Sequence, residues 1–261
     1  MKQLASLLLA LAILLFCISA SAADSPATAS VRYEGTGFDT PEDAVTCYMN
    51  GLKNLDFEQM LSAFAWETLA AHYSAEKQVN RLKAYSPVLT ARMPSFNAFM
   101  EAANLHSFRA NETRLIYNAL EAYIMGENYH QGFAVSLKDE AEADAYLQQF
   151  DNGKVEALAG MSEIIFLTPD QVTDNKFSME TNRESFQRQT APYGADEVVN
   201  VVALAFVGDG TVRCMPTVAR YGDRWYLVSV SSFTEMILGI DTNHQAFFYT
   251  EDAVKNLFRG E

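Results

Sequence analysis

Cysteine is scarce in this sequence: the 261 residues contain three, and one of them, Cys17, lies in an apolar run near the start. The other two, Cys47 and Cys214, are far apart and belong to no C-x-x-C pair, which excludes a thioredoxin-type redox motif and a zinc knuckle. In an exported protein they could form one disulfide, but the spacing does not show whether their Cα atoms come within bonding distance. The sequence leaves this bond open and favours two separately buried thiols.

Positive charge is also scarce, since 19 Lys and Arg residues stand against 33 Asp and Glu residues and the formal net charge is −14 at pH 7. The sequence has no cluster of Lys and Arg of the kind that attracts phosphate groups. We therefore expect no nucleic-acid partner and no binding to anionic membrane surfaces.

Sequence signatures of catalytic and metal sites are missing. There is no H-E-x-x-H, no G-x-S-x-G and no glycine-rich loop before a predicted helix. The acids between Asp139 and Asp144 lack the order and the turn glycine of a calcium loop, so we expect a solvated helix face there. His72 and Glu76 are spaced to lie side by side on one helix, and we expect an ordinary surface pair. The sequence thus predicts no metal and no cofactor, and it identifies no catalytic residue.

Only one long apolar run is present, from Leu4 to Ala20, and it follows Lys2 and precedes the small residues of the segment 20–22. This order is typical of a secretory signal peptide, predicted over residues 1–22. An uncleaved anchor is the alternative, because the run approaches the ~20 residues that span a bilayer. We expect a secreted or cell-surface chain with no membrane insertion after signal removal. Residues 23–38 are small, polar and interrupted by Gly and Pro, which predicts a flexible linker.

Two short helices are predicted between Thr40 and Thr68. Thr40 is a good N-cap, Pro41 suits the first helical position, and the apolar residues that follow recur at helical spacing. Asp56 has the features of the cap of a second amphipathic helix. Helices are also predicted after a Ser95 cap, after an Asn111 cap and over residues 138–150.

In the C-terminal third the apolar residues no longer recur at helical spacing. Three apolar, β-branched runs between residues 198 and 230 are separated by glycine turns at Gly208 to Gly210 and at Gly222, which predicts an antiparallel meander. Pro216 cannot donate to a ladder, so its strand should be bulged or at an edge there. A further strand is expected within residues 161–169 and a short helix after Thr250. Helices first and an antiparallel sheet last predict an α+β fold.

The sequence resembles the nuclear-transport-factor-2-like superfamily in four motifs: the capped T-P-E start, the A-V-x-x-Y stripe, the Leu55-Asp56-Phe57 corner and the closing Gly-Asp-Arg-Trp-Tyr. The resemblance covers roughly residues 37–66 and 196–231. This superfamily folds as a cone of helices on a curved sheet, and its exported bacterial members begin in a similar way. The resemblance implies a single domain over residues 39–261, with a helical insertion at about 67–154. It also implies a pocket between helices and sheet, which some members use for isomerase, dehydratase or hydrolase chemistry and many for binding. No catalytic motif of the family can be matched here.

Four side chains are the candidates to line such a pocket: Tyr48, Trp66, Arg213 and Trp225. Aromatic rings with hydroxyl or indole donors suit a small apolar ligand, and a strand arginine suits an anionic one if it points inward. The alternative is a filled core in which the aromatic rings are structural.

The sequence therefore predicts an exported, non-catalytic module that binds a small apolar or anionic ligand or another cell-surface protein. The alternative is a small-molecule enzyme that uses acid–base chemistry in the cone cavity. That alternative requires at least two of five side chains to converge: Tyr48, His72, Glu121, His130 and Arg213.

Overall fold

The computed structural model describes residues 31–82, 92–125, 136–167, 191–208, 210–214, 216–230 and 246–250. The chain divides into two compact units, Met1–Arg32 and Tyr33–Glu261, and the elements below belong to the second. The predicted signal segment and His130 lie outside the described residues.

Helices come first in this unit: α2 (Pro41–Lys53), α3 (Phe57–Ser62), α4 (Trp66–His72), α5 (Ala75–Leu82), α6 (Ala98–Met125), α7 (Glu140–Leu147) and α8 (Asn152–Ala157), with 3-10 turns η3 (Leu158–Gly160) and η6 (Ala191–Tyr193). Both predicted caps of the first pair are confirmed. Thr40 Oγ1 accepts the N–H of Asp43 at 3.1 Å, and Asp56 Oδ1 accepts the N–H of Gln59 at 2.9 Å. The local sequence alone thus fixes where α2 and α3 begin.

The prediction of two helices capped by Ser95 and Asn111 is wrong, because one 28-residue helix, α6, covers both segments. Asn97 Oδ1 accepts the N–H of Met100 at 3.0 Å, while Ser95 Oγ accepts the side chain of Asn104. Asn111 lies inside α6 and its side chain donates to Glu112. Its amide therefore does not compete with the helical backbone.

The strands follow the helices and are antiparallel: β1 (Ile165–Leu167), β2 (Glu197–Asn200), β3 (Val202–Val207), β4 (Gly210–Cys214), β5 (Thr217–Tyr221), β6 (Arg224–Ser229) and β7 (Ala246–Thr250). They form one sheet in the order β1-β3-β4-β7 and another in the order β2-β5-β6. The meander and the strand within 161–169 are confirmed, and the α+β class with it. β7 was not predicted, and the helix expected after Thr250 lies outside the described residues.

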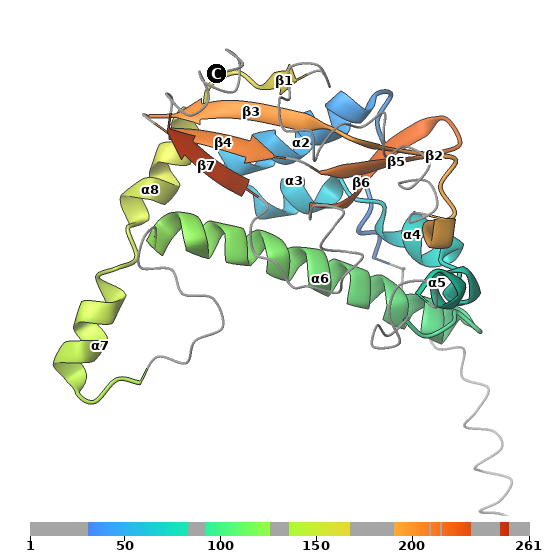
Figure 1. Ribbon diagram of the computed structural model, residues 1–261, viewed down its shortest axis with the longest axis horizontal. Helices are drawn as coiled ribbons and strands as arrows, with labels where there is room; N and C mark the ends of the chain where they lie inside the picture. Colours follow the sequence, from blue (N-terminus) through green and yellow to red (C-terminus); the bar gives the residue numbers. More distant parts are fainter. Residues whose placement is uncertain are drawn as a thin grey trace, which may run out of the picture. The chain divides into compact units, whose positions relative to one another are not determined.

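The two sheets share one bent hairpin. Asn200 pairs with Thr217 and Ala203 with Cys214, so the same register runs through both halves. Between them the N–H of Val201 donates to the carbonyl of Pro216 at 3.2 Å. Proline has no N–H to return this bond, so the ladder is weakened and the hairpin bends at this point. Figure 1 shows the two sheets at opposite ends of the hairpin.

The outer edge of β6 is covered by the N-terminal part of the unit. Phe38 and Trp225 exchange two backbone hydrogen bonds, and Leu227 bonds to the backbone of Ala63 and Ala65. An uncovered edge would expose unpaired N–H and C=O groups to other chains. Here the segment before α2 and the segment before α4 close that edge.

Residues 33–38, within the predicted linker, are held by hydrogen bonds. The N–H groups of Tyr33 and Glu34 donate to the two oxygens of Glu67, and Glu34 accepts from the N–H of Thr68 at 2.8 Å and from its hydroxyl at 2.6 Å. Ala65, the N-cap of α4, makes no side-chain cap bond. Glu34 thus takes over this role from a distant part of the sequence, next to the positive end of the helix dipole.

The core lies where α2 contacts β5 and β6 (Figure 1). Ala44, Val45, Met49 and Phe64 are 0% exposed. A hollow wide enough for water would expose the side chains along its wall, so these four side chains belong to a filled core. Among the described residues no helix is both long enough and apolar enough to cross a membrane.

Candidate functional site

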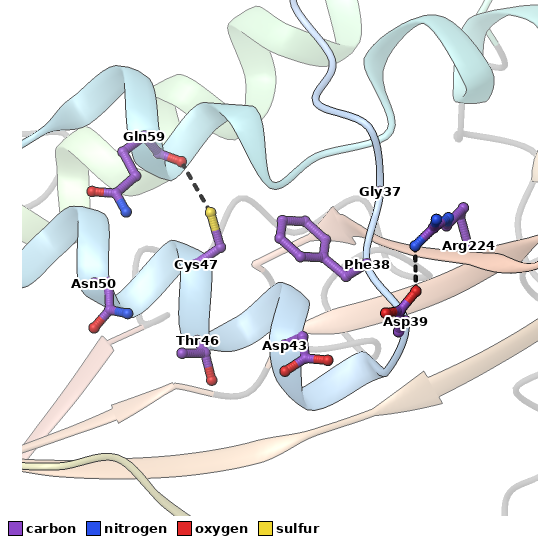
Figure 2. Close-up of a pocket in the computed structure, with 9 residues that line it drawn as sticks. All are labelled: Gly37, Phe38, Asp39, Asp43, Thr46, Cys47, Asn50, Gln59 and Arg224. Carbon is purple, nitrogen blue, oxygen red and sulfur yellow. Dashed lines mark hydrogen bonds and ion pairs between the residues drawn. The ribbon is translucent and has the colours of Figure 1, made fainter.

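A polar groove lies beside α2 and has a volume of about 460 Å³. Figure 2 shows the side chains around it, which come from the segment before α2, from α2, from α3 and from the start of β6. The residues that line the groove are Gly37, Phe38, Asp39, Asp43, Thr46, Cys47, Asn50, Gln59 and Arg224.

The groove face of α2 follows from helical spacing. Thr46 and Cys47 follow Asp43 by three and four positions, and Asn50 follows them by four and three, so the four residues share one side of the helix. The opposite side carries the buried residues of the core, such as Val45 and Met49. The same turns of helix therefore build the core and the groove.

Gly37 permits the close approach that forms the end of the groove. Its φ is +75°, and a Cβ there would lie 2.5 Å from the ring of Tyr226. Glycine adopts this left-handed conformation without steric cost, whereas a side chain would be strained and would displace Tyr226. This glycine thus positions Phe38 and Asp39 over α2.

The charged groups of the groove are Asp39, Asp43 and Arg224. Arg224 Nη1 donates to Asp39 Oδ1 in an ion pair whose side chains are 43% and 83% exposed. An exposed pair of this kind contributes about 0 to 1 kcal/mol and exchanges partners easily. Figure 2 shows Asp43 on α2 beside the ring of Phe38, between Thr46 and Asp39.

The thiol of Cys47 is half-buried in the groove wall. Its Sγ lies 3.8 Å from the carbonyl oxygen of Gln59 and 3.9 Å from Ser62 Oγ. Burial raises the pKa of this thiol, and the Ser62 hydrogen bond only partly offsets the shift. The thiol of Cys47 is therefore a weaker acid than an exposed cysteine and forms less of the thiolate that acts as a nucleophile.

A second hollow of about 580 Å³ lies between α3 and α6, and its walls are mainly apolar. Phe57 and Leu61 come from α3, and Ala110 and Tyr117 from α6. Arg109 donates to Glu58 across one end at 3.0 Å and packs 4.1 Å above the ring of Tyr33. We refer to it as the α3–α6 groove.

Two of the four predicted ligand residues lie in the core. Trp66 is 1% exposed, stacks on Phe64 with a 4.6 Å centroid distance, and donates its indole N–H to the carbonyl of Leu61 at 2.8 Å. Its donor is thus used within the protein. Tyr48 is 8% exposed and packs edge-on against Phe64.

Arg213 and Trp225 lie elsewhere. Arg213 alternates with Val212 and Cys214, which join the core under the helices, so its buried side chain lies on the opposite face of the sheet beside Leu204. Trp225 is half-buried on β6, and the guanidinium of Arg220 lies 5.8 Å from its ring. The structure does not bring the four predicted residues together in one pocket.

The two cysteines are separate thiols rather than a disulfide. Cys47 and Tyr48 are neighbours on α2 but point about 100° apart, so the thiol faces the groove while the tyrosine faces the core. Burial raises the pKa of Cys214 to about 12. The open question from the sequence is thus answered in favour of two free thiols.

A buried carboxylate joins α6 to the end of β6. Glu112 is 6% exposed and accepts from Ser229 Oγ at 3.1 Å and from the N–H of Val230 at 3.0 Å. Burial raises its pKa, and these hydrogen bonds and Arg92 oppose the shift. Burial also raises the pKa of Tyr48 well above its usual value, with Cys214 and Glu112 adding to it. Sequence reasoning missed Glu112, because it has the spacing of an ordinary helix acid.

Three of the residues proposed for acid–base chemistry, Tyr48, His72 and Arg213, lie apart from one another. Tyr48 lies under the helices and Arg213 on the other sheet face, while His72 is exposed at the end of α4. His72 Nδ1 lies 2.7 Å from the carbonyl of Thr68, and Glu76 belongs to α5, so the expected pair on one helix is wrong. Within the described part of the chain, no three His, Cys, Asp or Glu side chains are grouped to hold a metal ion.

Neither the protein-family models nor the curated protein sequences give a match to this chain. Among solved structures it is similar to a cystatin-like protein from Ruminococcus gnavus, with 16% identity and a TM-score of 0.43. The alignment covers 80% of this chain and 44% of that one, so the chain spans less than half the length of that protein. This distant likeness does not bear on ligand or activity.

Proposed function

We propose that this chain is an exported, non-catalytic binding module of the nuclear-transport-factor-2-like cone superfamily, and that the polar groove beside α2 holds a small ligand. The observation that carries the proposal is the groove itself. Side chains from distant parts of the sequence line this open groove, and its volume of about 460 Å³ is within the usual range for small-molecule sites. The separation of Tyr48, His72 and Arg213, which were candidates for acid–base chemistry, supports binding rather than catalysis.

The binding proposal is tested by filling the groove. A panel of amino acids, polyamines, sugars and dicarboxylates is screened against the full chain by ligand-observed NMR. Thr46→Trp places a large side chain in the groove and should abolish binding of every hit. Ala141→Trp places the same side chain on exposed α7 and should leave binding unchanged. A panel in which Thr46→Trp blocks no hit, or chemical turnover of any hit, would contradict the proposal.

The export proposal rests on the apolar run after Lys2 and the small residues before Ala23. It predicts that the chain recovered outside the exporting cell begins at Ala23. N-terminal sequencing of that material checks this. Recovery only in the membrane fraction with Met1 retained would instead support the uncleaved anchor.

Protein interaction is a second candidate, and the α3–α6 groove is the observation that favours it. Its mainly apolar walls and the residue Tyr117, which is 60% exposed, resemble the core of a protein interface more than a polar ligand site. Tyr117→Glu should abolish partner binding and leave ligand binding in the polar groove intact.

A further inference from the structure

We propose that the ligand of the polar groove is an organic cation with an ammonium or guanidinium group. This inference rests on the proposed binding function and specifies the chemical class of the ligand. It replaces the anionic ligand expected from Arg213, because that arginine lies on the other face of the sheet.

The first step is the charge of the walls. Asp39 and Asp43 bring two negative charges and Arg224 brings one positive charge, which is already paired with Asp39. The groove thus carries an excess negative charge centred on Asp43. The net charge of −14 on the whole chain adds a field that draws cations and repels anions.

The N-terminus of α2 opposes this and must be weighed. The positive end of a helix dipole attracts anions. Here Glu42 and Asp43 already place two carboxylates in the first turn, and Thr40 Oγ1 accepts the N–H of Asp43. The dipole amounts to about half a positive charge, which Glu42 alone offsets, so the negative excess at Asp43 remains.

The second step is the aromatic ring in the groove. Figure 2 shows the ring of Phe38 between Cys47 and the Asp39–Arg224 pair, with Asp43 beside it. The negative face of an aromatic ring attracts a cation, and carboxylates beside the ring strengthen this attraction. An anion would meet the same ring and the same carboxylates unfavourably.

The third step is the ease with which the ion pair can open. The side chains of Asp39 and Arg224 are both substantially exposed, so little stability is lost if Arg224 swings into solvent. A ligand ammonium can then take its place on Asp39, while the hydroxyl of Thr46 and the amide of Asn50 offer acceptors for the rest of the ligand.

The test compares three probes with the same four-carbon backbone: 1,4-diaminobutane, succinate and 1,4-butanediol. Each is titrated into the full chain at low salt and followed by calorimetry. We expect binding of the diamine alone, with weaker binding at higher ionic strength because the groove is open to solvent. Asp43→Asn should weaken diamine binding about tenfold, the usual effect of losing a charged hydrogen-bond acceptor.

Asp144→Asn is the matched control, because it removes the same charge from an exposed position on α7. It should change diamine binding less than about twofold, since a distant surface charge is screened. Equal weakening by Asp43→Asn and Asp144→Asn would show attraction to the acidic chain as a whole and would overturn the inference.

The remaining outcomes separate this inference from the function on which it rests. Succinate or butanediol binding that Thr46→Trp abolishes would overturn the cation and keep the binding function. Diamine binding that withstands Thr46→Trp would overturn the cation inference for this groove. Absence of any ligand blocked by Thr46→Trp, in these titrations and in the wider panel, would overturn both.

Discussion

The two faces of α2 use the same thirteen residues for different purposes. One face is buried against the sheet and is apolar, while the other carries Asp43, Thr46, Cys47 and Asn50 along the polar groove. Packing fixes the first face, since every side chain there touches others on several sides. The second face is not packed against the sheet, so its side chains can contact a ligand. Substitutions should therefore change stability on one face and binding on the other.

The largest effect is expected from Met49→Ala on the core face. Met49 is 0% exposed, and its truncation should lower the free energy of unfolding by about 2 to 5 kcal/mol through lost burial and the cavity that remains. Its neighbour Asn50→Ala on the groove face should stay within about 0.5 kcal/mol. Urea unfolding of both variants measures this. Equal destabilisation by the two would remove the distinction between the faces.

Gly51→Ala provides a sharper test, because helix propensity and packing predict opposite signs. Alanine is the better helix former, yet a Cβ at Gly51 would lie 2.6 Å from the backbone nitrogen of Met60. The backbone of α3 would have to shift to make room for this Cβ, so we expect the free energy of unfolding to fall by about 1 to 3 kcal/mol. Gly160→Ala is the control, because its Cβ would meet nothing within 4 Å. Stabilisation by Gly51→Ala would mean that α3 does not pack closely on α2.

The sequence revealed the core face of α2 but not the groove face. Thr40 and Asp56 could be recognised as caps because capping depends on residues three positions apart, and the apolar stripe because it repeats at helical spacing. Asp43 has the spacing of an ordinary acid in the first turn of a helix, which gives no sign of a groove. Its neighbours in the groove include Arg224, which reaches Asp39 across 185 positions of the chain. No local pattern carries that contact.

Trp66 and Arg213 show a second limit on what can be predicted from the sequence. Both were expected to line a pocket, since aromatic and basic side chains on core elements suit a ligand. Whether such a side chain is buried depends on the neighbours that the fold brings to it. Here the ring of Trp66 stacks on Phe64, and its indole N–H donates to the carbonyl of Leu61. For Arg213 the register of β4 decides the face, and one position of difference reverses it.

A substitution at Glu112 tests the core side of α2 by changing a buried ionisable group rather than the volume of a side chain. Its folded pKa is raised above the ordinary value of 4.5, so the folded chain holds this proton more tightly than the unfolded chain. The resulting stability is fully present below about pH 4.5 and is lost as pH rises through the folded pKa, at up to about 1.4 kcal/mol per pH unit. Glu112→Gln should remove this slope in urea unfolding across pH 4 to 8. A slope that persists in this variant would assign it to another group.

The smallest effect is a difference in rate between the two thiols. Cys47 is half-buried on the groove face, whereas Cys214 is 3% exposed and burial raises its pKa to about 12. A maleimide should therefore label Cys47 slowly in the folded chain and Cys214 only after unfolding, because the reagent needs both access and thiolate. Peptide mass mapping distinguishes the two sites. If 1,4-diaminobutane occupies the groove, it should slow labelling of Cys47 several-fold and leave Cys214 unchanged, whereas equal protection of both would indicate general stabilisation of the fold.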